Sequence, residues 1–292
     1  MVSEKTRRPK LLIAVGSAGI NPWLAIEKKA QMPIIRAAMS GLAEVVWIEG
    51  DPNISSKLRY RVLNWLLLKQ MGVMYSRRIW VRNFFKKTWN RWEWVTFGAS
   101  YLTWMARNRQ TQPGAESEGP RVTQDLPIQM ALAGSRTINA LQYVLDTYDF
   151  DYLLRITSTC LPVPGELRRL LGRLPPLRVY GGELMKFAGT NFVSGAAVLL
   201  SRDVVEGVCE NAGSYSYGVY EDVALGRLIQ SEDLADLIAI PRVDVTSVHQ
   251  VPRDAQPAWP GATVVRCKAQ HPTTTESEPV IDIMRKVSRH LI

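Results

Sequence analysis

The chain has 292 residues, of which 46% are hydrophobic and 22% charged, and its formal net charge at pH 7 is +9. This size and composition predict one large α/β domain, or two small ones, with an ample core. Three cysteines without metal-ligand spacing argue against a disulfide framework and favour a reducing, cytosolic compartment. Because the first residues are polar and no apolar run reaches about 18 residues, we expect neither a signal peptide nor a transmembrane helix.

Residues 1–56 are predicted to form a β-α-β unit of the kind that opens a nucleotide-binding fold. Residues 10–15 read as a strand, residues 23–40 as a helix and residues 43–48 as a second strand. In the turn between the first strand and the helix, four small or polar residues are expected to bind the donor: Gly16, Ser17, Gly19 and Asn21. A tight turn with small residues for close packing explains the same pattern.

Residues 57–110 are predicted to form a basic, aromatic-rich helical insertion. Between positions 57 and 109 there are twelve Lys or Arg, one acid and six of the nine Trp. Cations beside aromatic rings suit a helix that lies in the interface of an anionic membrane. The candidate docking residues are Arg77, Arg78, Lys86, Lys87, Trp89, Trp92 and Trp94. A structural insertion is the main alternative, and nucleic-acid binding is disfavoured because no recognised binding motif accompanies the charge.

The rest of the chain divides by composition. Residues 111–126 are rich in helix and strand breakers and predict a loop. Residues 127–251 continue the same domain as its central and acceptor-binding catalytic part, in which residues 238–248 are predicted to form a strand that ends at His249. Residues 252–292 are predicted to be a polar loop followed by an amphipathic helix.

Three motifs lie between residues 149 and 227. Residues 152–156 form an apolar strand containing Arg155, and three hydroxyl residues follow where the strand would end: Thr157, Ser158 and Thr159. In open α/β sheets, ligands bind beyond the carboxyl ends of strands. A second apolar run, 192–200, is interrupted at Ser194-Gly195, where backbone can approach a ligand closely. A later helix begins with two carboxylates, Glu221 and Asp222, at its positive end.

Together these motifs resemble the inverting GT-A glycosyltransferases of the β-1,3-glycosyltransferase (fringe-like) group. The matching residues, in order, are Ser194-Gly195, Leu200-Ser201-Arg202-Asp203 and Glu221-Asp222-Val223-Ala224-Leu225-Gly226. The family's acidic metal-binding triplet is replaced by Thr157, Ser158 and Thr159. The resemblance covers residues 135–250 and implies a GT-A-like, Rossmann-type mixed sheet flanked by helices.

The resemblance further implies transfer of a sugar, with a UDP-sugar as the preferred donor, to a glycan or lipid-linked acceptor. The cysteine usage and the basic insertion lead us to expect this reaction at the cytoplasmic membrane face. Asp222 would be the general base and Glu221 its hydrogen-bonding neighbour, since inverting transfer needs one base to deprotonate the acceptor. Phe192, Ser194 and Gly195 would contact the acceptor. Two alternatives stay open: the carboxylates only stabilise their helix, or the protein is a non-catalytic relative that binds membrane or glycan.

The leaving group is expected to be handled without a metal. Hydroxyls bind Mg²⁺ or Mn²⁺ poorly because these hard cations prefer carboxylates. Fixed cations would then stabilise the diphosphate, with Arg155 and His249 as candidates. The alternatives are that Arg155 forms a salt bridge within the protein, that His249 is an ordinary loop residue, and that Mn²⁺ or Mg²⁺ is required. The DxD-like pair Asp149 and Asp151 precedes the strand, which places it at the end of the sheet away from the expected ligand.

Overall fold

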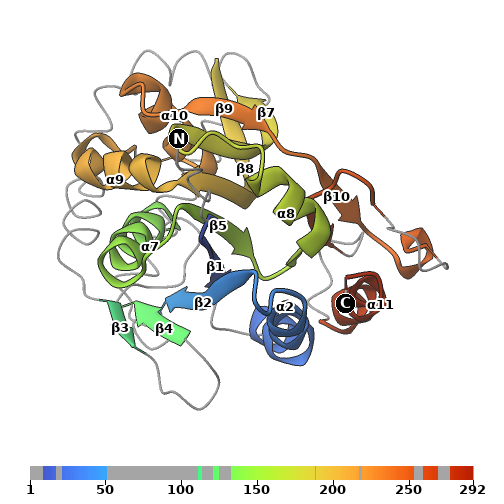
Figure 1. The fold of residues 1–292 in the computed structure, drawn as a ribbon. Coiled ribbons are helices and arrows are strands. Elements are labelled where there is room, and N and C mark those ends of the chain that lie inside the picture. Colours follow the sequence, from blue (N-terminus) through green and yellow to red (C-terminus); the bar gives the residue numbers. More distant parts are fainter. Residues whose placement is uncertain are drawn as a thin grey trace, which may run out of the picture.

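The computed structural model describes residues 9–17, 22–50, 111–113, 121–124, 133–187, 189–216, 219–252, 259–268 and 277–291. The predicted basic insertion, 57–110, and all of its candidate docking residues lie outside these ranges, as do Gly19 and Asn21. Within them, a mixed sheet lies between two layers of helices (Figure 1). The predicted α/β class, with helices on both faces of a mixed sheet, is confirmed.

The main sheet has eight strands in the order β3-β4-β2-β1-β5-β8-β7-β9. Their bounds are β1 Leu11–Ser17, β2 Ala43–Gly50, β3 Thr111–Pro113, β4 Arg121–Gln124, β5 Tyr152–Thr157, β7 Val179–Phe187, β8 Thr190–Ser201 and β9 Asp236–Ala239. Strands β4, β2, β1 and β5 run parallel, and β8 runs antiparallel to β5 and β7. Since β1 pairs with both β2 and β5, the two described strands of the predicted β-α-β unit share one sheet with the central part of the chain.

A second, three-stranded sheet lies beside the main one. It has the order β10-β11-β6, with β10 at Arg242–Val245, β11 at Val264–Cys267 and β6 at Cys160–Pro162. Strand β6 follows β5 after a two-residue turn, so the small sheet begins at the carboxyl end of β5.

One face of the main sheet is covered by α7 (Ala133–Thr147), α9 (Arg202–Glu210) and α10 (Glu221–Ser231). The other face packs against α1 (Trp23–Ile26), the π-helical η1 (Glu27–Gln31), α2 (Met32–Ala38), α8 (Pro164–Leu171), α11 (Glu278–Ser288) and the small sheet. Two short 3-10 segments complete the described elements, η4 (Ala212–Ser214) and η5 (Val248–Gln250). In Figure 1, α7 and α9 lie on one side of the strands, and α2 and α11 lie on the other. Among the described residues, no helix is both long and apolar enough to cross a bilayer.

The sequence of β5 explains its central place. Leu153 packs into the core on the α7 side, while Leu154 and Ile156 pack into the core on the α2 side. A strand that is apolar on both faces is stable only where both faces are covered. Arg155 interrupts this pattern and needs a buried partner.

Three predicted boundaries are wrong. The segment 111–126, predicted as a loop, contains β3 and β4, because β4 finds a pairing partner in the exposed edge of β2. The tail predicted as loop from residue 252 contains β11, which pairs with β6 and β10. The single strand predicted for residues 238–248 is two strands, separated at Ile240 and Pro241, where proline cannot donate to a ladder.

Candidate active site

Two strand ends define the edge where the site lies. Strands β1 and β5 are parallel, and their register places Gly16 beside Thr157 at their carboxyl ends. Ser17 is the last residue of β1 and pairs with Glu49 of β2, so the strand extends two residues further than predicted. The edge therefore brings together two groups of residues that the sequence assigned to the donor.

The residues Thr157, Ser158 and Thr159, here called the hydroxyl turn, connect β5 to β6. The hydroxyls of Thr157 and Thr159 share a hydrogen bond of 3.3 Å. Gln31, fully buried in η1, donates its amide to the carbonyl oxygens of Thr157 (2.8 Å) and Cys160 (2.9 Å). Ser158 and Thr159 are each 7% exposed. The Gln31 side chain thus fixes the hydroxyl turn, although sequence analysis did not identify this residue.

A buried ion pair links β5 to α10. Arg155 Nη2 lies 2.8 Å from Glu221 Oε1 and 3.1 Å from Oε2, and the two side chains are only 15% and 13% exposed. Thr137 of α7 donates its hydroxyl to Glu221 Oε1 at 3.1 Å. Burial opposes the charge of Arg155, but the pairing with Glu221 outweighs it and raises the pKa of the guanidinium. Arg155 therefore pairs with Glu221 within the protein, whereas sequence analysis proposed it as a residue that binds the donor.

A second buried guanidinium lies beside this pair. Burial lowers the pKa of Arg136, on α7, to about 10, with Glu221 acting in the opposite direction and Arg155 adding to the decrease. Two guanidinium groups, those of Arg136 and Arg155, therefore lie close to Glu221 at the start of α10.

Asp222 is presented by the first turn of α10 against β8. Its Oδ2 accepts a hydrogen bond from the backbone N–H of Gly195 at 3.2 Å, and its Oδ1 accepts one from Val223 at 2.9 Å. A methyl group at position 195 would lie 3.3 Å from both Asp222 Cβ and Glu221 Oε2. Gly195 therefore permits a close approach, as predicted, but the groups that approach are the two carboxylates of α10.

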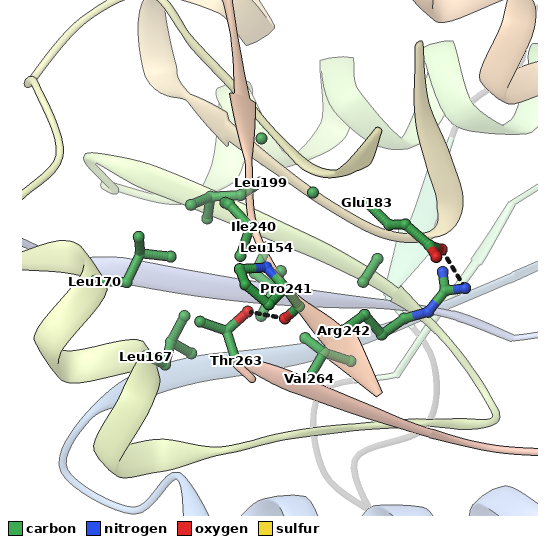
Figure 2. Close-up of a pocket in the computed structure, with 13 residues that line it drawn as sticks. Leu154, Leu167, Leu170, Glu183, Leu199, Ile240, Pro241, Arg242, Thr263 and Val264 are labelled. Atoms are coloured by element: carbon green, nitrogen blue, oxygen red, sulfur yellow. Dashed lines mark hydrogen bonds and ion pairs between the residues drawn. The ribbon is translucent and has the colours of Figure 1, made fainter. Parts of the chain in front are cut away.

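The neighbouring Ser194 is held by a charged cluster formed by Glu183, Arg242, Asp244 and Arg266. Arg242 donates from Nη1 to Ser194 Oγ at 2.9 Å. The same guanidinium pairs with Glu183 and, at 2.7 Å, with Asp244. Figure 2 shows the Arg242–Glu183 pair at one end of a recess whose other walls are mainly apolar, including Leu154, Leu167 and Ile240.

Two further predicted residues occupy different surroundings. Phe192 is 7% exposed and packs closely against Gly226 of α10, which gives it a core position. His249 is exposed in η5, after the strand that was expected to end there. Within the described part of the chain, no hydrogen bond or ion pair joins His249 to the hydroxyl turn or to Asp222. The assignments of Phe192 to the acceptor and of His249 to the donor stay predictions.

The remaining motifs have structural contacts. Asp149 and Asp151 lie before β5, as inferred from their position: Asp151 accepts from the backbone N–H of Lys10 at 2.6 Å, and Asp149 pairs with the Lys10 ammonium. Ser201, at the start of α9, accepts from the backbone N–H of Val179 through its hydroxyl at 2.9 Å. These contacts fasten β1 and β7 to the amino-terminal side of β5.

Two site residues were missed by sequence analysis, Gln31 and Arg242. Gln31 sits among apolar positions of a helix, and a polar residue on a buried face is the signal that could have identified it. Arg242 follows Pro241, which lies between β9 and β10. Its contact with Ser194 depends on the packing of the small sheet against β8, which no local pattern reveals.

No protein-family model matches the sequence, and comparison with curated proteins finds no match. Among solved structures, the chain is similar to the galactosyltransferase LgtC in complex with donor and acceptor sugar analogs, with a TM-score of 0.42 and 9% identity over 94% of this chain and 95% of that one. An active-site mutant of LgtC gives a TM-score of 0.43 and 11% identity over 97% and 100%. Mouse xyloside xylosyltransferase 1, in its apo form, gives 0.39 and 9% over 91% and 99%. Such low scores carry no argument for a shared family or activity.

Proposed function

We propose that this protein is a GT-A-like inverting glycosyltransferase that moves a sugar from a nucleotide-sugar donor to an acceptor hydroxyl. One observation carries the proposal. The carboxylates Glu221 and Asp222 begin α10 directly against Ser194-Gly195 of β8, beside the end of β5 where the hydroxyl turn begins. This arrangement brings together two of the motifs that carry the resemblance, Ser194-Gly195 and the acidic start of α10.

Asp222 is the general base in this proposal. Glu221 is held by Arg155 and Thr137, so its oxygens are already engaged. Each oxygen of Asp222 accepts one backbone hydrogen bond, which fixes the carboxylate in one orientation. A carboxylate oxygen has a second lone pair, which can accept the proton of an attacking hydroxyl. Arg155 and Glu221 then position the start of α10, and Asp222 performs the proton transfer.

The donor is proposed to bind at the carboxyl edge of β1 and β5. Gly16 and the hydroxyl turn lie there, and hydroxyl donors suit phosphate and ribose oxygens, each bond contributing roughly 1 kcal/mol net. The turn does not fit a divalent cation, because it offers neutral hydroxyls, two of which bond to each other. We therefore propose that fixed cations stabilise the departing diphosphate, and that a UDP-sugar is the preferred donor.

The test compares Asp222→Asn with the wild type. Turnover of UDP-, GDP- and CMP-sugars is measured with and without EDTA, and donor affinity is measured by calorimetry. Loss of a general base predicts a turnover lower by at least about a hundredfold with donor affinity retained. Asp282→Asn is the matched control, because Asp282 lies on α11 with 62% of its side chain exposed. Near-normal turnover in Asp222→Asn would contradict the proposal that Asp222 is the general base.

A second candidate is a non-catalytic protein with a glycosyltransferase-like fold that binds glycan or membrane. The engaged state of Glu221 and the replacement of the acidic triplet favour it. The same donor screen separates the two, since this candidate predicts that no donor is hydrolysed or transferred even where one binds. Docking of residues 57–110 on an anionic membrane at the cytoplasmic face stays part of the prediction from sequence.

A further inference from the structure

One face of the small sheet carries polar and charged side chains. Strands β10 and β11 pair Asp244 with Arg266, and β11 and β6 pair Arg266 with Cys160. Residues paired directly across strands project from the same face of a sheet. This face is turned toward β8, because Arg242 donates to Ser194 Oγ and the Cys160 thiol donates to the carbonyl oxygen of Ala196 at 3.2 Å.

The two arginines of this face differ in how their donors are used. Arg242 is 7% exposed and bonds through Nη1 to Ser194, through Nη2 to Glu183 and through Nε to Asp244. Its guanidinium is therefore occupied by protein groups on every nitrogen. Arg242 holds β10 against β7 and β8, and it neutralises the two carboxylates of the charged cluster.

Arg266 has no such partners. Its nearest carboxylate contact joins Nη1 to Asp244 Oδ2 at 3.9 Å, which is too long for a hydrogen bond. Its Nε is buried without a hydrogen-bond partner, although 27% of the side chain is exposed. A guanidinium has five N–H donors, and leaving a buried one unused is unfavourable. The buried Nε is out of reach of a ligand from solvent, so the donors that Arg266 can offer are those of its Nη groups, for which the described residues supply no hydrogen-bond acceptor.

The location of Arg266 connects it to the hydroxyl turn. Cys160, directly opposite Arg266, contacts the hydroxyl of Thr157 at 3.4 Å. Burial raises the pKa of the Cys160 thiol, while the hydrogen bond from Thr157 and the charge of Arg266 oppose that increase. The positive charge of Arg266 is therefore felt at the end of β5, where the donor is proposed to bind.

We propose that Arg266 binds the phosphoryl oxygens of a diphosphate at the end of β5. This inference rests on the proposed function, in which the diphosphate is the leaving group of the donor. Guanidinium presents paired donors in a fixed geometry that matches phosphate oxygens. The four formal charges of the cluster sum to zero, so the attraction comes from the unused donors of Arg266. It replaces Arg155, which Glu221 already occupies, as the cation for the leaving group.

The experiment titrates inorganic pyrophosphate and, separately, UDP into the full-length protein by calorimetry, after treatment with EDTA and desalting. Arg266→Met is expected to weaken the Kd for both ligands by at least about tenfold, the scale of a hydrogen bond to a charged group. Arg266→Lys, which keeps the charge but loses the fork, is expected to lie between Arg266→Met and the wild type. If circular dichroism shows that Arg266→Met is unfolded, the Kd values of Arg266→Lys provide the test.

The matched control is Arg285→Met on α11. Arg285 has a similarly long contact, 3.8 Å to Asp282, and 56% of its side chain is exposed. Its removal subtracts the same charge and is expected to leave both Kd values unchanged. Equal losses in Arg285→Met and Arg266→Met would show general electrostatics and overturn the inference.

The remaining outcomes separate this inference from the proposed function. Unchanged binding in Arg266→Met, or a wild type that binds neither ligand, overturns the inference. If Arg266→Met binds normally while the wild type turns over a nucleotide-sugar, the inference fails and the function stands. If pyrophosphate binding depends on Arg266 but no donor is turned over, the anion site stands and the transferase assignment fails. Binding of UDP but not pyrophosphate would show recognition of the nucleoside alone and overturn the inference.

Discussion

Replacing Arg155 by methionine tests whether the buried ion pair holds α10 against the sheet. Methionine keeps the length of the apolar stem and removes only the guanidinium. Glu221 then keeps the hydrogen bond from Thr137 but loses a cation 2.8 Å away, at a position where its side chain is 13% exposed. Removing one member of a buried pair costs about 3–5 kcal/mol; because the pair retains some exposure and one hydrogen bond, we expect about 2–4 kcal/mol.

The assay is urea unfolding at pH 7, followed by circular dichroism, with the free energy of unfolding obtained by linear extrapolation. A double-mutant cycle adds Glu221→Gln and the double variant. The double variant should be more stable than the sum of the single effects predicts, with a coupling of about 1–3 kcal/mol, because each single change strands a buried polar group.

Lys29→Met is the matched control for this cycle. Lys29 pairs with Glu278 at 2.7 Å, nearly the same distance, but the two side chains are 54% and 59% exposed. Solvent screens such a pair, so its loss should change stability little. The reasoning is refuted if Arg155→Met loses no more stability than Lys29→Met, or if the effects of Arg155→Met and Glu221→Gln simply add.

Two further predictions concern packing and thiol chemistry. Gly226→Ala should lower the free energy of unfolding by about 1–3 kcal/mol, because its methyl group would lie 2.5 Å from Phe192 Cβ. Gly165→Ala in α8 should raise the free energy of unfolding by up to about 1 kcal/mol, because the nearest atom to the added methyl group would be 4.0 Å away. Thermal melts in which both variants shift in the same direction would contradict this prediction. Burial raises the pKa of Cys209 to about 12 and raises those of Cys160 and Cys267 as well, so the native protein at pH 8 should label slowly with a thiol reagent. All three thiols should react rapidly in denaturant, and a fast-labelling thiol in the native protein would show that burial has been misjudged.

The sequence predicted the parts of the site that depend on local patterns. The apolar runs of β5 and β8 mark buried strands, and the polar residues that interrupt them, Arg155 and Ser194-Gly195, mark the places where another element approaches. The order of strand and acids also placed Asp151 at the amino end of β5, where it bonds to Lys10. Such inferences hold because strand direction decides which residues share an edge.

The sequence did not predict the contacts made by the small sheet. Strands β10, β11 and β6 come from three separate segments, and the pairing of β6 with β11 joins residues about a hundred positions apart. Each strand is only three or four residues long, so its own periodicity is too short to recognise. The partner of Arg155 could not be predicted either, because a ligand or a carboxylate from a distant part of the chain can satisfy a buried guanidinium.

The position of β1 in the sheet has a consequence for folding. Strands β5, β8, β7 and β9 all lie between residues 152 and 239, whereas β1 must pair with β5 across 141 residues of chain, the separation of Lys10 and Asp151. Closing long loops is entropically unfavourable and slows the pairing of distant strands. We therefore expect the carboxyl-terminal strands to assemble first and to leave one side of β5 unpaired. Until β1 arrives, that open edge is where a nascent chain is most exposed to pairing with another copy of itself.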